Sequence, residues 1–196
     1  MRPLMVELCA GTGTMAAAFR ALGWRTLTAD VDARHKPDVC ADVRALGVEL
    51  VSEVPGFVWA SPPCPEFSRH DQPWTKARNP PEPDMSITRA CVALIVAWSP
   101  PWWCVENVRG AGPWYRPILG RHVDHIGRAH WLYGRLPVLG KVPVGRQKQS
   151  RSSEASVSRS AYAPESCAHI ARAVDDAVRL LGVERLEVRH IEGVGR

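Results

Sequence analysis

Cys64 is the residue whose type and setting best suit nucleophilic chemistry. It lies between Pro62-Pro63 and Pro65, where a short apolar run gives way to a long polar loop. A cysteine thiolate is a strong nucleophile, and a carboxyl group that burial keeps protonated can stabilise the negative charge that its attack creates. Glu106, at the end of a later apolar run, could supply that carboxyl group. The alternatives are a core cysteine and a glutamate in a surface turn.

A glycine-rich turn follows the first apolar run, in the segment Glu7-Leu8-Cys9-Ala10-Gly11-Thr12-Gly13. Glycines let the backbone approach a ligand closely, and the start of the next helix presents free N–H groups. The spacing lacks the third glycine of the dinucleotide fingerprint, so NAD fits it poorly.

Acidic residues end the next two apolar runs. Asp30 ends the second run, with Asp32 as a neighbouring candidate, and Asp42 follows the third. An acid at the end of the second strand commonly holds ribose hydroxyls, and a carboxylate after the third could accept a hydrogen bond from an adenine amino group. The alternative is that these acids, like the glycines, are ordinary turn residues.

Short apolar runs alternate with helical patterns along the first half of the chain. The expected strands cover 4–8, 24–29, 39–40, 57–60 and 102–105, and the expected helices cover 15–22 and 86–98. A polar loop at 61–83 follows the fourth strand, and Asp84 or Ser86 can cap the next helix. The sequence therefore predicts an α/β fold with a mostly parallel sheet and helices on both faces.

The second half of the chain has weaker patterns. Strands are expected at 129–133 and 138–144, with a mobile loop rich in Ser and Arg at 147–160. A helix is expected to begin at Pro164 and to end before Gly182, with one apolar face. The residues of that face are Cys167, Ile170, Ala171, Val174, Val178 and Leu181. Residues 183–196 are expected to form an edge strand or a tail.

Composition narrows the class of protein. The chain has 196 residues, 45% of them apolar, which suits one globular domain better than two. Its net charge of +5 is compatible with a polyanionic partner, although many basic proteins bind none. No window approaches the roughly 18 uninterrupted apolar residues of a membrane span, and no signal-peptide core follows Arg2-Pro3. We therefore expect no membrane contact and a cytoplasmic location.

The six cysteines form no C-x-x-C pair, which argues against a metal site or a disulfide framework. All of them except Cys64 lie in or beside apolar patterns, so structural roles are expected for these five. They are Cys9, Cys40, Cys91, Cys104 and Cys167.

Four segments, taken in order, resemble the cytosine-C5 DNA methyltransferases. They are Glu7 to Gly13, Asp30-Val31-Asp32, Ser61-Pro62-Pro63-Cys64, and Cys104-Val105-Glu106-Asn107-Val108. The resemblance covers about residues 4 to 110. Two further segments, Arg109-Gly110-Ala111 and Trp131-Leu132-Tyr133-Gly134, look like the short phage-type members, which lack a separate target-recognition domain.

The resemblance implies a Rossmann-like methyltransferase catalytic domain over residues 1–182 that uses S-adenosyl-L-methionine and releases S-adenosyl-L-homocysteine. It implies that Cys64 adds to C6 of a flipped-out cytosine in DNA while Glu106 acts at N3. The implied cofactor-binding residues are Cys9, Ala10, Gly11, Thr12, Gly13, Thr14, Asp30, Val31, Asp42 and Pro62. The implied substrate-binding residues are Pro63, Ser68, Arg69, Asn107 and Arg109. We expect a monomer, with a dimer left open, in a bacterial cell or a phage-infected host.

The chain departs from the family pattern at several positions. Cys9 and Val31 stand where the family has aromatic residues, so cofactor stacking is expected to be weaker or to come from Trp24 or Trp59. Residues 147–151 match the family's Q-x-R-x-R motif only in part, and the family's closing Asn-Ser-Val motif is absent.

The chain after Glu106-Asn107-Val108 is short. About fifty residues precede the closing helix, which leaves no room for a target-recognition domain, so we expect a short or relaxed target of about two or three base pairs. The candidate DNA contacts are Arg69, His70, Trp74, Lys76, Arg78, Arg109, Arg116 and Arg121, with a solvated basic surface as the alternative. Two other functions stay open: the same chemistry on RNA or a free cytosine nucleotide, and a binding module without catalysis.

Overall fold

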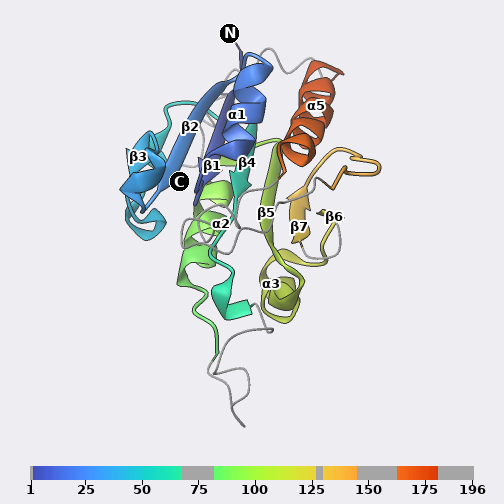
Figure 1. Ribbon diagram of the computed structural model, residues 1–196. Coiled ribbons are helices and arrows are strands. Elements are labelled where there is room, and N and C mark those ends of the chain that lie inside the picture. The colour runs from blue at the N-terminus through green and yellow to red at the C-terminus, as the bar shows by residue number, and fades with distance from the viewer. Residues whose placement is uncertain (1, 68–81, 127–129, 145–162, 181–196) are drawn as a thin grey trace, which may run out of the picture.

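The computed structural model describes residues 2–67, 82–126, 130–144 and 163–180 (Figure 1). Within these residues the strands form one seven-stranded sheet. The strands are β1 (Leu4–Leu8), β2 (Arg25–Asp30), β3 (Val39–Cys40), β4 (Phe57–Ala60), β5 (Trp102–Val108), β6 (Asp124–Ile126) and β7 (His130–Arg135). The α-helices are α1 (Thr14–Ala21), α2 (Ser86–Trp98), α3 (Gly112–Leu119) and α5 (Pro164–Leu180).

The strand order is β3-β2-β1-β4-β5-β7-β6. The five strands from β3 to β5 in this order run parallel, and β7 runs antiparallel to both β5 and β6. From β1 the chain first builds β2 and β3 on one side, then crosses to build β4 and β5 on the other. Ligands of such Rossmann-like α/β sheets bind where the direction of winding reverses, at the carboxyl ends of the strands. Here that point lies beside β1 and β4.

Helices cover both faces of the sheet. On one face α1 and α5 lie side by side, and their apolar residues pack on Met5, Phe57 and Trp59 (Figure 1). On the other face α2 and α3 pack on Val6 and Val58. All five residues of β1 are buried, which explains why this strand is a continuous apolar run apart from Glu7.

The predicted fold class is confirmed, as are the elements of the first half of the chain to within a few residues. The helix predicted from Pro164 is also present, and the predicted apolar face is buried from Cys167 to Val178. Asp84 accepts a hydrogen bond from the N–H of Ser86 at 2.8 Å, so it satisfies a donor at the start of α2. The predicted loop at 147–160, Leu181 and the predicted tail at 183–196 lie outside the described residues.

The strand predicted at 138–144 is wrong. Leu139 and Val142 are buried against the α5 side of the sheet, but their segment is irregular. Side chains of α5 bind its backbone instead of a neighbouring strand: Ser166 donates to the carbonyl of Pro143, and a ring nitrogen of His169 contacts the carbonyl of Leu139. Apolar spacing alone did not distinguish this buried loop from a strand.

Two elements were not predicted, and one was predicted too short. Helix α3 contains Pro113 and Pro117, which mask its pattern, and β6 has only three residues. Strand β5 continues for three residues beyond the predicted end at Val105. It does so because β7 pairs with those residues, as in the register of Glu106 with Leu132.

Candidate active site

A cavity of about 470 Å³ opens at the carboxyl ends of β1, β2 and β4. All the residues expected around a cofactor line this cavity, except Gly13 and Pro62. Pro63 and Cys64 also line it, so the loop that carries the candidate nucleophile borders the glycine-rich turn. The fold therefore brings three separated sequence segments to one place.

The glycine-rich turn has a backbone that favours glycine. Gly11 and Gly13 have φ angles of 51° and 66°, in the left-handed region. A Cβ at Gly11 would meet nothing within 4 Å, so the turn faces open space. Cys9 also has a left-handed φ of 53°, and its sulfur lies 4.0 Å from that of Cys91 on α2.

Glu7 is a cavity residue that was not expected to have a role. Its Oε2 accepts a hydrogen bond from the N–H of Ala16 at 2.7 Å, and the N–H of Met15 also binds the carboxyl group. The carboxyl group therefore occupies donors at the start of α1 that were expected to be free for a ligand. Burial raises the pKa of Glu7 to about 7, although these hydrogen bonds act in the opposite direction. An acidic residue inside an otherwise apolar strand was the feature of the sequence that could have indicated a role for Glu7.

Asp30 links the glycine-rich turn to the end of β2. Its two carboxylate oxygens accept hydrogen bonds from the N–H groups of Gly11 and Asp32, each at 2.8 Å. The rival candidate, Asp32, pairs instead with the exposed side chain of Arg34. Asp30 therefore lines the cavity with its carboxylate fixed, whereas Asp32 is held on the surface.

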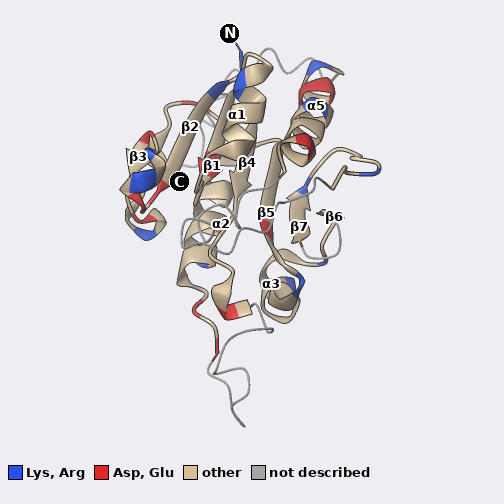
Figure 2. Ribbon diagram, viewed as in Figure 1, with Lys and Arg blue, Asp and Glu red and all other residues tan. Residues whose placement is uncertain are grey.

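Asp42 lines the far end of the cavity and pairs with Arg44, whose hydrogen bonds lower the pKa of Asp42 to about 2. Acidic and basic residues are interleaved around β3 in this way (Figure 2). Val31 is 70% exposed at the cavity mouth, where the family has an aromatic residue. The expectation that Trp24 or Trp59 could supply stacking is wrong, because both are buried in the core.

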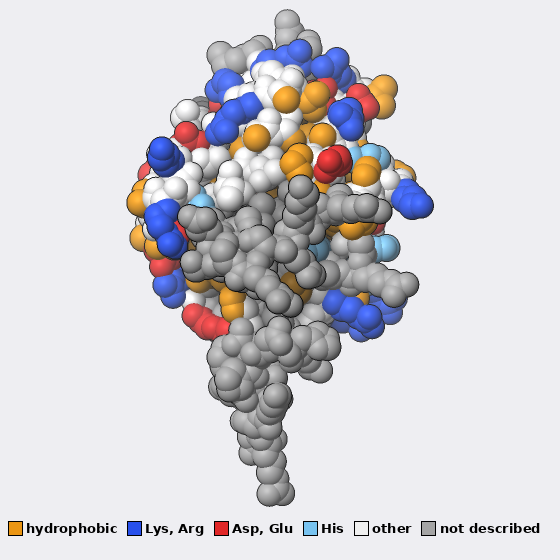
Figure 3. All heavy atoms as spheres, viewed as in Figure 1, with side chains coloured by type: hydrophobic (Ala, Val, Ile, Leu, Met, Phe, Trp, Pro, Cys, Tyr) orange, Lys and Arg blue, Asp and Glu red, His pale blue; other side chains and the backbone are white. Residues whose placement is uncertain are grey.

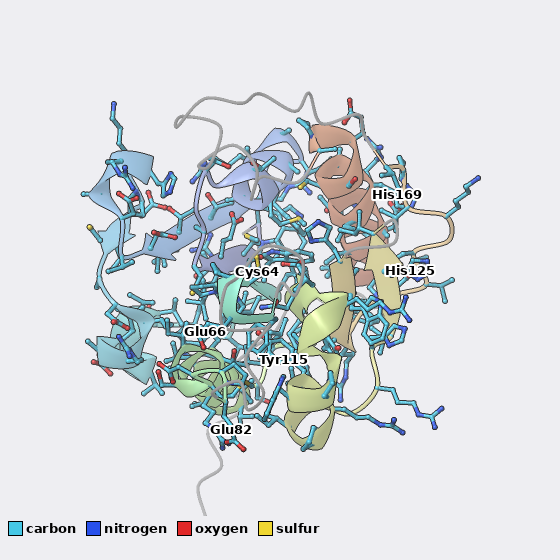
Figure 4. The ribbon with its side chains drawn as sticks, turned by 60° about the horizontal axis from the view of Figure 1, so that its bottom comes forward. Cys64, Glu66, Glu82, Tyr115, His125 and His169 are labelled. Atoms are coloured by element: carbon cyan, nitrogen blue, oxygen red, sulfur yellow. The ribbon has the colours of Figure 1, made fainter. Side chains whose placement is uncertain are left out.

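The loop around Cys64 is held by contacts on both sides. The carbonyl of Cys64 accepts a hydrogen bond from the N–H of Phe67, which closes a short 3-10 turn, Pro65–Phe67. The Phe67 ring is buried against Tyr115 of α3. A Cβ at Gly110 would lie only 2.0 Å from the Phe67 carbonyl, so this close approach requires glycine. Figure 4 shows Cys64 near the centre of this end of the molecule.

Glu106 lies within β5, not in a surface turn, and is 4% exposed. Its Oε1 lies 2.7 Å from Nδ1 of His130 on β7, and Ser61 also hydrogen-bonds the carboxyl group. Trp59 in turn donates to the hydroxyl of Ser61 at 2.7 Å. Burial raises the pKa of Glu106, and the His130 contact opposes that rise. Glu106 does not line the cavity itself, but Ser61 does, so Ser61 connects the two.

Asn107 was expected to contact substrate, but it is fully buried. Its side-chain amide donates to the carbonyl of Pro62 at 3.0 Å and to the hydroxyl of Tyr115 at 2.8 Å. The amide N–H groups therefore bind the protein itself. Asn107 positions the loop that leads to Cys64.

The other expected substrate contacts are only partly described. Arg109 is exposed, and its guanidinium lies 5.8 Å from the centre of the Trp131 ring, on which His122 stacks. Arg116 and Arg121 are also exposed, in α3 and just after it. Six candidate contacts lie outside the described residues: Ser68, Arg69, His70, Trp74, Lys76 and Arg78. The segment 147–151 also lies outside them.

The other cysteines divide into two groups. Cys91, Cys104 and Cys167 are buried, as expected of structural residues. Cys9 is half-buried and Cys40 is exposed on β3 at the edge of the sheet, so burial does not account for these two. In the described part of the chain, no group of three or more His, Cys, Asp or Glu side chains could hold a metal ion. No helix there is long and apolar enough to cross a membrane.

Comparisons with known proteins add a distant likeness of fold. No family model matches the chain, and no curated protein matches it. Among solved structures, it is similar to a protein described as a DNA modification methyltransferase from an E. coli prophage, with 15% identity, a TM-score of 0.46 and coverage of 68% of this chain and 46% of that one. It is also similar to the S. pombe Dnmt2 methyltransferase, with 15% identity, a TM-score of 0.44 and coverage of 69% and 50%. A Spodoptera frugiperda DNMT2 mutant matches with 14% identity, a TM-score of 0.41 and coverage of 68% and 50%. The matched part of this chain spans about half the length of these proteins.

Proposed function

We propose that this protein transfers a methyl group from S-adenosyl-L-methionine to C5 of cytosine in DNA. One observation carries the proposal: Cys64 lines the same cavity as Gly11 and Asp30. A candidate nucleophile and a candidate cofactor turn thus border the same open cavity.

The residues of the cavity fit a nucleoside cofactor. Its volume of about 470 Å³ lies in the usual range of small-molecule sites. The carboxylate of Asp30 has more lone pairs than its two backbone hydrogen bonds use, so it can also accept from ribose hydroxyls. Both oxygens of Asp42 already accept hydrogen bonds from Arg44, so an adenine amino group would share this carboxylate with Arg44, while Val31 and Ile87 offer apolar contact. When bound, S-adenosyl-L-methionine supplies an electrophilic methyl group.

Cys64 and Glu106 can divide the chemistry on the base between them. The Cys64 thiolate forms a bond to C6 of cytosine, and the electron pair of the C5–C6 double bond becomes available at C5. The negative charge that spreads toward N3 is stabilised by a proton on the Glu106 carboxyl group, which burial favours. C5 then takes up the methyl group as the methyl–sulfur bond of the cofactor breaks, which leaves S-adenosyl-L-homocysteine. The C5 proton passes to water, its electron pair re-forms the C5–C6 double bond, and the Cys64–C6 bond breaks to return the thiolate.

Charge supports a nucleic-acid substrate. The net charge is +5, and the exposed Arg109, Arg116 and Arg121 lie in and around α3. Figure 3 shows basic side chains gathered at the lower right of the visible face, over α3. Such residues bind phosphates without reading sequence, which agrees with a short or relaxed target.

The test is methyl transfer from labelled cofactor to duplex DNA, RNA or dCMP. We expect label in DNA, as 5-methylcytosine. Duplex DNA with 5-fluorocytosine in place of cytosine should trap a complex that survives denaturing electrophoresis, because fluorine cannot leave C5 as a proton. Cys64→Ser should abolish both results. Cys40→Ser should change neither, because Cys40 is exposed and does not line the cavity, and serine keeps a donor for its contact with the carbonyl of Val31. Label found only in RNA or only in dCMP would show that DNA is not the substrate. An adduct at another cysteine would refute the mechanism.

A further inference from the structure

His130 was not expected to have a role, yet it contacts the candidate catalytic carboxyl group. In the antiparallel pairing of β5 with β7, His130 lies opposite Val108, two residues from Glu106 on the same face of the sheet. This diagonal arrangement brings Nδ1 of His130 to 2.7 Å from Oε1 of Glu106. The contact is short enough for a charge-assisted hydrogen bond.

The two partners differ in their access to water. The side chain of Glu106 is 6% exposed, whereas that of His130 is 33% exposed. A buried carboxyl group exchanges protons with solvent through a neighbour, and histidine both accepts and donates a proton near neutral pH. Ser61 binds the same carboxyl group from the side of the cavity. Glu106 is therefore held between the cavity and a residue that reaches solvent.

We propose that His130 is a positioning residue for Glu106: it fixes the carboxyl group and connects its proton to solvent. This inference rests on the proposed function, since it concerns the carboxyl group that acts on the base. It also assigns a partner to Glu106 within the described part of the chain.

Other titratable groups lie near the pair on neighbouring elements. Cys104 lies two residues before Glu106 on β5, and Tyr115 lies on α3; burial raises the pKa of both, so both stay neutral at the pH values of the test. Asp124 on β6 acts electrostatically on Cys104. Glu7 on β1, two strands from β5, lines the cavity and has a pKa of about 7, so the pH profiles are measured in a Glu7→Gln background, where a change in charge across neutral pH is attributed to the pair.

Two substitutions separate positioning from packing. His130→Gln keeps a hydrogen-bond donor that does not titrate, and His130→Arg keeps a permanent positive charge. We expect His130→Gln to lower kcat by about ten-fold or more, with an unchanged KM for the cofactor, because neither partner lines the cavity. His130→Arg keeps a contact to the carboxyl group, but its permanent charge favours the ionised form of Glu106, so kcat should fall and the alkaline fall in rate, which follows loss of the Glu106 proton, should move to lower pH. The matched control is His125→Gln on β6, an exposed histidine that lies away from Cys64 in Figure 4.

A readout that does not need activity tests the pair separately. The Glu106 carboxyl carbon can be followed by ¹³C NMR as a function of pH in the wild type and in His130→Gln. Because the His130 contact lowers the pKa of Glu106, its midpoint should move to higher pH in the variant. An unchanged midpoint, or an unchanged kcat and pH profile in His130→Gln, would overturn the inference. A wild type inactive on every nucleic acid would refute the proposed function, and the carboxyl titration would then decide the pairing alone.

Discussion

The side-chain amide of Asn107 donates a hydrogen bond to the carbonyl of Pro62, at 3.0 Å. This bond joins β5 to the loop that carries Cys64, forty-five residues earlier in the chain. The same amide binds the hydroxyl of Tyr115, which contacts the hydroxyl of Thr88 on α2 at 2.9 Å. Glu106 and Asn107 are adjacent in a strand and so point to opposite faces of the sheet. Asn107 therefore links the two signature segments, while Glu106, the carboxyl group of the proposed mechanism, points to the other face.

Replacing Asn107 should affect stability and catalysis together. Asn107→Ala leaves two buried acceptors without this donor, so the free energy of unfolding should fall by about 1–3 kcal/mol. Because the loop of Cys64 loses an anchor, kcat should fall by about ten-fold or more. Thr88→Val, which removes only the outer contact of Tyr115, should lower the free energy of unfolding and leave kcat close to wild type. Denaturant unfolding and methylation rates measure both effects, and equal kcat values for the two variants would contradict this role.

Asp30 and Asp32 make a matched pair of variants for the cofactor site. Asp30→Asn should weaken binding of S-adenosylhomocysteine by about 1–3 kcal/mol, because a fixed carboxylate in the cavity loses its charge. Asp32→Asn should change affinity little, since that carboxylate pairs with Arg34 at the surface. Isothermal titration calorimetry distinguishes the two. A greater loss of affinity in the Asp32 variant than in the Asp30 variant would show that Asp32, not Asp30, contacts the ribose.

The fold was predictable because its parallel strands are short apolar runs with helical patterns between them. The same reasoning placed Cys64, Asp30 and the glycine-rich turn together, since the carboxyl ends of parallel strands meet at one edge of a sheet. The prediction of secondary structure failed where tertiary packing overrides the local sequence pattern. The segment around Leu139 has apolar spacing but binds side chains of α5, and α3 forms despite its two prolines.

Roles that depend on distant partners could not be predicted. His130 lies in a segment without any catalytic signature and becomes relevant only through the antiparallel register of β7 with β5. Asn107 lies in a segment that resembles a family motif, but its side-chain amide donates a hydrogen bond to the carbonyl of Pro62. The charged loop after Phe67 lies outside the described residues, so its predicted DNA contacts stay predictions.

Glu7 should make the stability of the protein depend on pH. The pKa of Glu7 is about 7 in the folded protein, against an ordinary value of 4.5 for glutamate, so the folded state binds more protons between these values. The contribution of Glu7 to stability is therefore greatest below about pH 4.5, falls as pH rises toward 7 and is constant above, with a total loss on the order of 3 kcal/mol. Glu7→Gln should remove this component, because glutamine keeps an acceptor for the N–H of Ala16 and does not ionise.

The measurement is denaturant unfolding at several pH values between 4.5 and 8. Glu53→Gln serves as the control, since Glu53 is 38% exposed and pairs with Arg25 at the surface. It should leave the fall in stability unchanged. If the difference in the free energy of unfolding between the wild type and Glu7→Gln does not vary with pH, Glu7 is ionised when buried.

Arg109 should contribute a phosphate contact to DNA binding. It is exposed directly after β5, one residue before the glycine that packs on the Cys64 loop, so DNA at the site would lie within its reach. Arg109→Ala should weaken binding to all DNA sequences alike and reduce the slope of log K against log salt by about one. Arg172→Ala, an exposed arginine on α5 over the other face of the sheet, should leave the slope unchanged. Fluorescence anisotropy between low and moderate salt measures both. Equal slopes for the two variants would place the DNA elsewhere, and a flat response in the wild type would favour a nucleotide substrate.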